Sequence, residues 1–207
     1  MSRLRIGLVS KSPRRYKLLK ELGFDVVVLS HEVTTEDVEV TTTDPCSLVI
    51  KNAMRKLRSA SKIPKDIDYL LAIDTMVFID DKALSKPSSK HGALTYLKFL
   101  NGKCHEVYSG VALRRVSDGV EVTGCEGTVV CFDVIDDEAL RLYVETGEPM
   151  DKAGAYAIQD LGKLLVKEVH GDFYNVMGLP IVLLKRLFKE LGLDFTKYTY
   201  EQCLKDK

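Results

Sequence analysis

The first 29 residues constrain the fold more than any other part of the chain. Residues 4–9 are mostly apolar and predict a buried strand. Ser12-Pro13 predicts the start of a helix, because serine is a favoured N-cap and proline fits the first helical position. Gly23 ends that helix, and residues 26–29 form a second apolar run. A strand–helix–strand unit of this kind predicts a parallel or mixed sheet flanked by helices.

The rest of the chain continues to alternate between helices and strands. Asp74-Thr75 interrupts a strand pattern, and Ser117-Asp118-Gly119 predicts a hairpin turn. We expect an α/β fold in which a mixed sheet flanked by helices forms two lobes with a central cleft. Residues 1–195 form one domain in this prediction, and residues 196–207 form a polar, frayed tail. The pattern predicts a loop at 31–44, strands at 69–73, 76–79, 107–116, 120–134 and 163–170, and helices at 44–61, 89–100, 136–145 and 180–191.

The charge balance argues against two classes of protein. The chain carries 30 basic and 30 acidic residues, and a net charge of zero is unusual for nucleic-acid-binding or membrane-surface proteins. Basic residues nevertheless concentrate in residues 1–20 and 51–65, on either side of an acidic stretch. Cations beside carboxylates suit a small anionic ligand that arrives with a metal ion. Solvated helix faces explain most of these side chains equally well.

The cysteines and the apolar runs bear on location. Five cysteines form no C-x-x-C pair and four histidines are scattered, so we expect no structural zinc site. An odd, widely spaced set of cysteines is typical of a reducing compartment. No apolar run has the length of a signal peptide core or a membrane helix. These patterns predict a soluble, cytoplasmic protein.

The junction at residues 10–15 is the first candidate for chemistry. Its sequence is Ser-Lys-Ser-Pro-Arg-Arg, and it lies between the first predicted strand and the first helix. The start of a helix offers free N–H groups to an anion, and arginine grips phosphate oxygens in pairs. An ordinary capped helix with surface arginines would give the same pattern.

Three further segments carry polar side chains at positions where ligands bind. Asp74 follows an apolar strand, where a carboxylate can hold a metal or act as a general base. Lys86-Pro87 supplies a cation after a loop. Residues 146–159 are long and irregular, and they contain Asp151, Lys152 and Gln159, whose amide can read a base edge. For Asp74 and Lys86 alone, a turn aspartate and a loop lysine are sufficient explanations.

Taken together, these segments resemble the Maf-like family of nucleotide pyrophosphatases. Residues 10–15, Asp74-Thr75, Lys86-Pro87, 147–156 and 171–180 occur in the family's order. The resemblance implies an elongated fold similar to that of inosine triphosphate pyrophosphatases. It also implies hydrolysis of a nucleoside triphosphate to the monophosphate and pyrophosphate, with magnesium or manganese as the divalent cation.

The resemblance assigns substrate-binding roles to five residues. Ser10, Arg14 and Arg15 would hold the triphosphate, with Arg14 also affecting substrate choice. Thr75 and Gln159 would face the base, and both look like the branch that prefers dTTP and UTP over 7-methyl-GTP.

The catalytic and metal-binding roles implied by the resemblance fall on four residues. Asp74 would accept the proton of the attacking water or organise the metal, while Lys56 and Lys86 would complete the catalytic set. The family's usual acidic pair is altered here, so Glu36 is the expected metal ligand beside Asp74, and Glu32 is its rival.

Two further points bear on the choice of function. A non-catalytic nucleotide-binding regulator of cell division would share the fold. The sequence contains no Walker motif, which argues against a P-loop mechanism because the phosphate cradle would be missing. The expected partner is the nucleoside triphosphate, without nucleic acid or membrane, and the resemblance is compatible with a homodimer.

Overall fold

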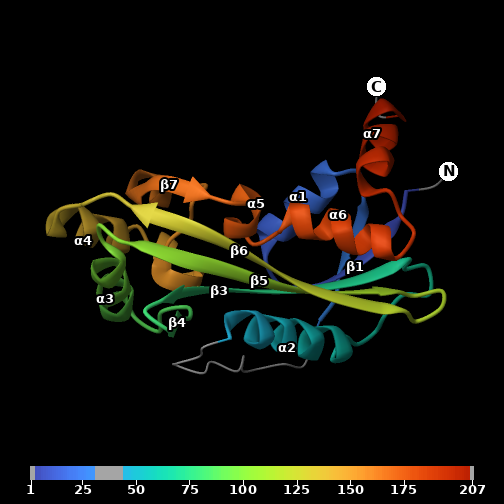
Figure 1. The fold of residues 1–207 in the computed structure, drawn as a ribbon, viewed down its shortest axis with the longest axis horizontal. Coiled ribbons are helices and arrows are strands. Elements are labelled where there is room, and N and C mark those ends of the chain that lie inside the picture. Colours follow the sequence, from blue (N-terminus) through green and yellow to red (C-terminus); the bar gives the residue numbers. More distant parts are fainter. Residues whose placement is uncertain (1–2, 31–43, 206–207) are drawn as a thin grey trace.

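The computed structural model describes residues 3–30 and 44–205 of the chain (Figure 1). Its strands are β1 (Arg5–Val9), β2 (Asp25–Val28), β3 (Tyr69–Ile79), β4 (Lys82–Leu84), β5 (Cys104–Arg115), β6 (Glu121–Phe132) and β7 (Val166–His170). Its α-helices are α1 (Pro13–Glu21), α2 (Pro45–Arg58), α3 (Lys90–Leu100), α4 (Asp137–Glu145), α5 (Phe173–Val176), α6 (Ile181–Glu190) and α7 (Phe195–Lys205). Three short 3₁₀ helices complete the order: η1 (Glu148–Asp151), η2 (Ala153–Ala155) and η3 (Leu161–Leu165).

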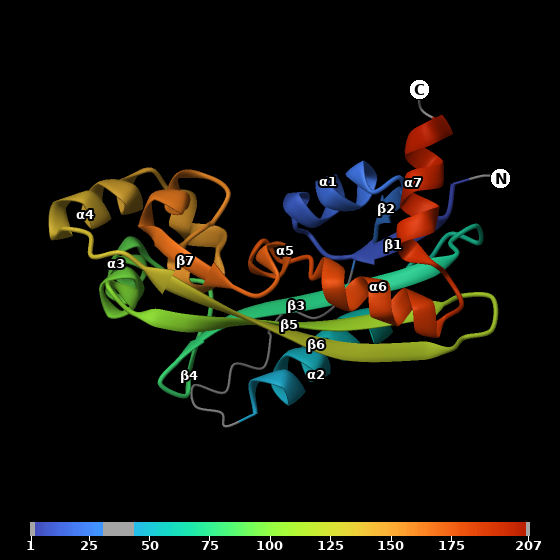
Figure 2. The same cartoon turned by 45° about the horizontal axis from the view of Figure 1, so that its top comes forward.

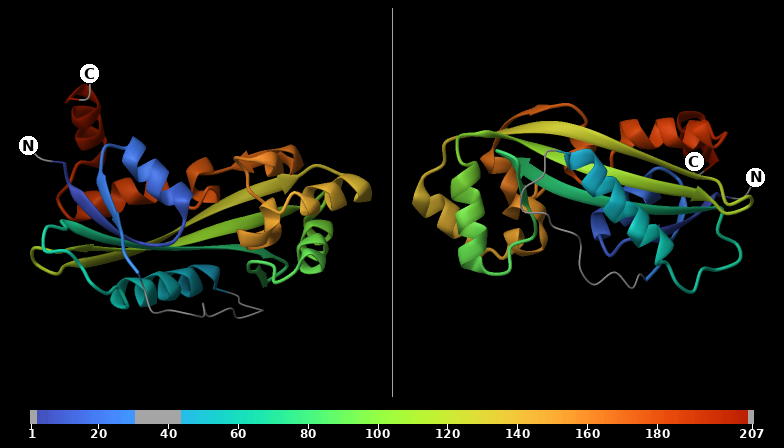
Figure 3. Two further views of the ribbon diagram at one scale, coloured as in Figure 1. Left: turned by 180° about the vertical axis from the view of Figure 1, so that it is seen from behind. Right: turned by 60° about the horizontal axis from the view of Figure 1, so that its bottom comes forward.

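The seven strands form one mixed sheet in the order β2-β1-β3-β5-β6-β7, with β4 paired to β3. β1 runs parallel to β2 and β3, and the remaining pairs are antiparallel. Helix α2 covers one face, and α1 and α6 cover the other (Figures 1 and 3). Helices α3 and α4 gather at one end of the long strands, whereas β1, β2 and α7 lie at the other (Figure 2). This arrangement confirms the predicted α/β fold with a mixed sheet flanked by helices.

Strand β3 runs through the middle of the molecule, and both of its faces are buried. Successive side chains of a strand point to opposite faces, so its residues divide between two apolar groups. Leu71, Ile73 and Val77 belong to the core beneath α1 and α6. Leu70 and Met76 belong to clusters that contain residues of α2. Asp74 and Thr75 therefore point to opposite faces of the sheet.

One edge of β3 is left open at the position of Asp74. β1 pairs with β3 only as far as Ala72, and β4 pairs with it from Val77 onward. Residues 73–76 thus have no strand partner on this edge among the described residues. The gap joins the two faces of the sheet, and the candidate site lies at it.

The structure corrects two of the predicted elements. β3 continues through Asp74-Thr75 rather than stopping there, because β5 pairs with it residue by residue across this stretch. The predicted frayed tail is instead the helix α7, whose Tyr198 hydroxyl accepts from Leu4 N at 2.9 Å and donates to Gly23 O at 3.1 Å. Both corrections depend on partners that are distant in the sequence.

The cysteines also differ from expectation. Cys46 is paired with Cys125, and Cys104 with Cys131, in two disulfides, while Cys203 is free and exposed. The pairs are 79 and 27 residues apart in the sequence, so the spacing alone did not suggest them. The odd, widely spaced set of cysteines predicted a reducing compartment, and the structure instead pairs four of them.

The helices bear on membrane insertion in one respect. Within the part of the chain that the structure describes, no helix combines the length and the apolar character needed to span a bilayer.

Candidate active site

The junction between β1 and α1 forms the first wall of the site. Ser10 follows the last residue of β1 and is buried, and its hydroxyl accepts from Ser12 N at 3.2 Å. Ser12 occupies the N-cap position without a side-chain capping bond, and Pro13 is the first helical residue, as predicted. The first turn of α1 therefore offers its positive end to a ligand.

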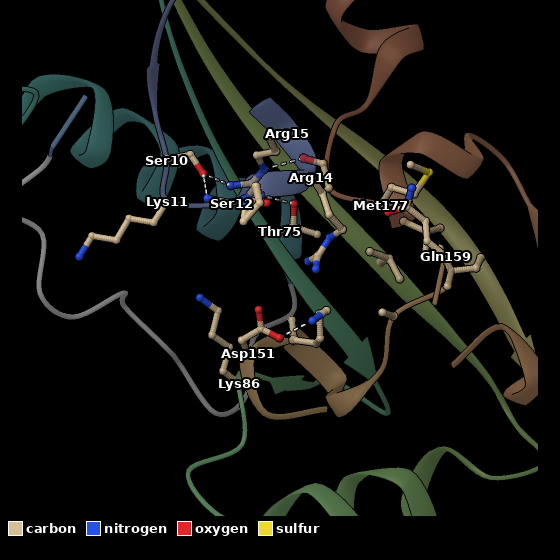
Figure 4. A pocket seen from close by; sticks show the side chains of 18 of the residues that line it. Ser10, Lys11, Ser12, Arg14, Arg15, Thr75, Lys86, Asp151, Gln159 and Met177 are labelled. Atoms are coloured by element: carbon tan, nitrogen blue, oxygen red, sulfur yellow. Dashed lines mark hydrogen bonds and ion pairs between the residues drawn. The ribbon is translucent and has the colours of Figure 1, made fainter. Parts of the chain in front are cut away.

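The two consecutive arginines of this junction have different surroundings (Figure 4). Arg15 donates to Gly178 O at 2.7 Å and to Ser10 Oγ and Ile73 O at 3.0 Å each. It also donates to Thr75 Oγ1 at 2.9 Å. Arg14 forms no hydrogen bond or ion pair with the described residues, and its guanidinium extends into the space between Asp151 and Gln159. Arg15 thus joins elements of the fold, whereas Arg14 faces the site.

Asp74 lies at the centre of a buried polar cluster on the α2 face of β3. Only 2% of Asp74 and 6% of Lys56 is exposed. Lys56 Nζ lies 2.6 Å from Asp74 Oδ1, and Asn52 Nδ2 donates to Asp74 Oδ2 at 2.9 Å. Each carboxylate oxygen therefore has a specific partner, which a buried charge requires.

A glycine on the neighbouring strand allows this cluster to form. Gly110 pairs with Asp74 across β3 and β5. A Cβ atom at Gly110 would lie 2.2 Å from the carbonyl carbon of Val49 in α2, which no side chain tolerates. The missing side chain therefore lets α2 lie directly on the sheet, and Asn52 and Lys56 reach Asp74 as a result.

Thr75 belongs to a second network on the opposite face. Its hydroxyl lies 2.8 Å from Ser109 Oγ and accepts from Arg15. Ser109 is fully buried and pairs with Thr75 across β3 and β5. Thr75 is half-buried and lines the cavity, but its hydroxyl is engaged by the protein.

A cavity of about 360 Å³ joins these elements. Its volume falls in the range of small-molecule sites. Positively charged side chains line it from four separate segments of the described chain, at residues 11–15, 56, 86 and 152. Asp74 is not among the lining residues, and Lys56 lies between it and the cavity. The predicted residues that line the cavity are Ser10, Arg14, Arg15, Lys56, Thr75, Lys86 and Gln159, together with Asp151 and Lys152.

The segment from Asp151 to Gln159 forms the far wall of the cavity. Gly154 has a φ of 67°, and a Cβ atom there would lie 2.8 Å from Val77 Cγ2, so glycine permits the segment to pack against β3. Lys152 is buried and pairs with Asp151. Gln159 is exposed, and its side chain lies on the opposite side of the cavity from Lys11 (Figure 4).

The motif at residues 171–180 has mainly a structural role. Asn175 is fully buried, and its amide donates to Val107 O at 2.9 Å and to Thr128 Oγ1 at 3.1 Å. Asp172 accepts from Val182 N at 3.0 Å at the start of α6. These bonds hold the backbone of Gly178 against Arg15.

Two site residues were missed from the sequence. Asn52 precedes Lys56 by one helical turn, so both side chains share a face of α2, and this spacing was an available signal. Ser109 gave no such signal, because its role depends on pairing with Thr75 across the sheet.

The predicted metal ligands are only partly within the described residues. Glu36 and its rival Glu32 lie outside them. Among residues 3–30 and 44–205, no group of three or more His, Cys, Asp or Glu side chains is arranged to hold a metal ion.

Comparison with known proteins identifies the family. The family model described as Maf-like protein matches residues 5–191. A dTTP/UTP pyrophosphatase of Thermoanaerobacter sp. (strain X514) is 40% identical over 192 residues, which cover 93% of this chain and 97% of that protein. The dTTP/UTP pyrophosphatase of Clostridium tetani is 39% identical over 90% of this chain and 97% of its own length. That of Caldanaerobacter subterraneus subsp. tengcongensis is 36% identical over 100% of this chain and 98% of its own length. The chain therefore belongs to the Maf-like protein family.

Proposed function

We propose that this protein hydrolyses dTTP and UTP to the nucleoside monophosphate and pyrophosphate. Relatives that carry the name dTTP/UTP pyrophosphatase match it over 90% or more of its length. None of these names points to the alternative of a non-catalytic regulator of cell division.

The observation that carries the proposal is the placement of cations around one cavity beside a buried carboxylate. Arg14, Lys86 and the positive end of α1 surround the space in which a polyanion would lie. Lys56 separates that space from Asp74. A triphosphate with several negative charges needs such a set of donors, and hydrolysis needs a nearby base.

Within this site, we assign Asp74 as the proton acceptor for the attacking water. Its position at the open edge of β3 and its fixed orientation between Lys56 and Asn52 support this role. Lys56 and Lys86 stabilise negative charge on the phosphates. Both lysines line the cavity.

The described residues fit a divalent cation held mainly by the substrate. Each oxygen of Asp74 accepts a bond from Lys56 or Asn52 and keeps a further lone pair. Mg²⁺ commonly binds through one or two carboxylates together with substrate phosphates. Asp74 would therefore hold Mg²⁺ or Mn²⁺, with Glu36 as the expected second ligand. The cation, when bound, neutralises charge on the phosphates.

Arg14 and Gln159 contact the substrate in this proposal, whereas Arg15 positions the site. Arg14 extends into the cavity, and Gln159 lies on the wall beyond it (Figure 4). Arg15 donates to acceptors on three different segments, so it orders Ser10 and Thr75 rather than competing for phosphate. Gln159 then faces the base.

The test is release of pyrophosphate from a panel of nucleoside triphosphates with Mg²⁺ or Mn²⁺. We expect dTTP and UTP to give the highest kcat/KM. Products must be the monophosphate and pyrophosphate, since release of orthophosphate would indicate cleavage at the γ-phosphate. Folded protein that releases pyrophosphate from none of the nucleotides would support the regulator instead.

Substitution of Gln159→Ala tests the base contact. We expect the preference for dTTP over dCTP to fall about tenfold, the worth of one net hydrogen bond. Asp160→Ala is the matched control, because Asp160 is the adjacent exposed residue and does not line the cavity. An unchanged nucleotide ranking in Gln159→Ala would remove Gln159 from the recognition site.

A further inference from the structure

The segment that carries Gln159 is closed by a single carboxylate. Glu148 begins the first 3₁₀ helix after α4, and Leu161 begins the third. Glu148 Oε2 accepts from Leu161 N at 2.9 Å, and its Oε1 accepts from Gly162 N at 2.9 Å. Glu148 is thereby bonded to the two residues that lie 13 and 14 positions later in the chain.

The hydroxyl of Tyr143 completes this contact from α4. It donates to Glu148 Oε1 at 2.8 Å and accepts from Ala157 N at 3.3 Å. Burial, followed by the hydrogen bond to Glu148, raises the pKa of Tyr143, so the hydroxyl keeps its proton and remains a donor. A Cβ atom at Gly162 would lie 2.6 Å from the Tyr143 hydroxyl oxygen, so only glycine fits at this position.

These hydrogen bonds matter because the backbone around Gln159 is not held by a helix or a strand. Residues 156–160 belong to no helix or strand. Gln159 itself is exposed, two residues before Leu161. A side-chain amide discriminates between base edges only when its backbone is held within a fraction of an ångström. The contacts at Glu148 lie close enough along the chain to supply that restraint.

The chemistry at this point requires a carboxylate. Among the described residues, all three partners of the Glu148 carboxylate are donors, namely two backbone N–H groups and one hydroxyl. An ionised carboxylate has only acceptors, and its bonds to such donors are strengthened by charge. A glutamine of the same shape would direct its NH₂ group toward at least one of these donors.

We propose that Glu148 is a positioning residue for nucleotide selection, acting through the backbone of Gln159. The inference rests on the proposed contact between Gln159 and the base. It assigns to Glu148 an effect on which nucleotide is preferred, without any contact to the substrate.

The experiment compares Glu148→Gln with Glu145→Gln by measuring kcat and KM for dTTP and dCTP. Glu145 lies one turn earlier, is exposed and pairs with Lys90, so it controls for the loss of one surface carboxylate. In Glu148→Gln, we expect the preference for dTTP over dCTP to fall on the order of tenfold, through KM more than through kcat. Glu145→Gln leaves the preference unchanged.

Two outcomes would overturn the inference while leaving the proposed function intact. One is an unchanged preference in Glu148→Gln when Gln159→Ala does alter it. The other is an equal loss of kcat/KM for both nucleotides, which would mean a merely structural role. If neither variant changes the preference, the proposed base contact itself is wrong, and the inference fails with it.

A double variant and a milder variant complete the test. If Glu148 acts through Gln159, then Glu148→Gln adds no further loss of preference in a protein that already carries Gln159→Ala. Losses of preference that add fully in the double variant would contradict this. Tyr143→Phe removes one donor to Glu148, together with the acceptor of Ala157 N, and leaves both backbone bonds to Glu148, so it should shift the preference in the same direction by less. It also keeps the inference testable if Glu148→Gln does not fold, since an unchanged preference in folded Tyr143→Phe then overturns it.

Discussion

The two faces of β3 at Asp74 and Thr75 are built from the same strand but hold different chemistry. On the α2 face, a carboxylate is buried against the ammonium of Lys56. On the α1 face, the guanidinium of Arg15 donates to the hydroxyls of Ser10 and Thr75, and the Thr75 hydroxyl is bonded in turn to Ser109. The α2 face holds the proposed base. The α1 face holds the hydrogen bonds of Arg15 that fix the cavity-lining residues Ser10, Thr75 and Gly178. Adjacent residues of one strand can therefore separate the reaction from the scaffold.

Removing the negative charge on the α2 face should have the greatest consequence. Asp74→Asn should reduce turnover about a thousandfold, because the proposed proton acceptor is lost. It should also lower the free energy of unfolding by about 3 kcal/mol, because the carboxylate partner of a buried ammonium is removed. Pyrophosphate release and urea unfolding measure the two effects.

Asp81→Asn is the matched control for that variant. Asp81 is exposed in the turn after β3 with a φ of 60°, which asparagine tolerates well. Both quantities should be unchanged in the control. Full activity in Asp74→Asn would show that the base lies elsewhere.

The second prediction concerns the α1 face. Arg15→Lys should lower the free energy of unfolding by about 2 kcal/mol, because one ammonium does not reproduce the spread of donors that reaches Gly178, Ile73 and Thr75. Thermal or urea unfolding without nucleotide measures this. If the free energy of unfolding equals that of the unmodified protein, the hydrogen bonds of Arg15 do not stabilise the fold.

Arg14→Lys distinguishes substrate binding from scaffolding within the same helix turn. Since Arg14 makes no hydrogen bond or ion pair with the described residues, the free energy of unfolding should change by less than about 0.5 kcal/mol. The KM for dTTP should rise severalfold instead, because lysine cannot grip phosphate oxygens in pairs. If Arg14→Lys and Arg15→Lys lose the same stability, the two arginines do not have separate roles.

The smallest effect on activity is expected at Thr75. Thr75→Val removes the hydroxyl that accepts from Arg15 and bonds to Ser109. It should lower the free energy of unfolding by about 1 kcal/mol. Because the hydroxyl is already engaged by the protein, nucleotide preference should hardly change. Thr75→Ser keeps the hydroxyl and should retain the stability. A large change of preference in Thr75→Val alone would instead give the hydroxyl a direct role at the base.

The sequence predicted the local parts of this site well. The helix start at Pro13 and the cations at Arg14 and Lys86 depend on nearby residues or on composition. The periodicity also predicted most helices and strands within a few residues.

The remainder depended on contacts between distant segments. Arg15 was indistinguishable from Arg14 in the sequence, because its acceptors include Gly178, which lies 163 residues away. The continuity of β3 through Asp74 follows from its pairing with β5, and α7 is held by the Tyr198 hydroxyl against the start of the chain. Glu148 gave no signal of its own, because two of the three partners of its carboxylate are backbone N–H groups across a loop.

The division of the site between the two faces of β3 can be tested most directly by a crystal structure with an α,β-imido analogue of dUTP and Mg²⁺. We predict phosphates against Arg14, Lys86 and the start of α1, and the pyrimidine facing Gln159. Asp74 should lie beside the α-phosphate, with Arg15 still bonded to Gly178 and Thr75. An analogue bound with its phosphates away from Arg14 and Lys86, or with Asp74 sealed behind Lys56 and out of reach of the α-phosphate, would contradict this assignment.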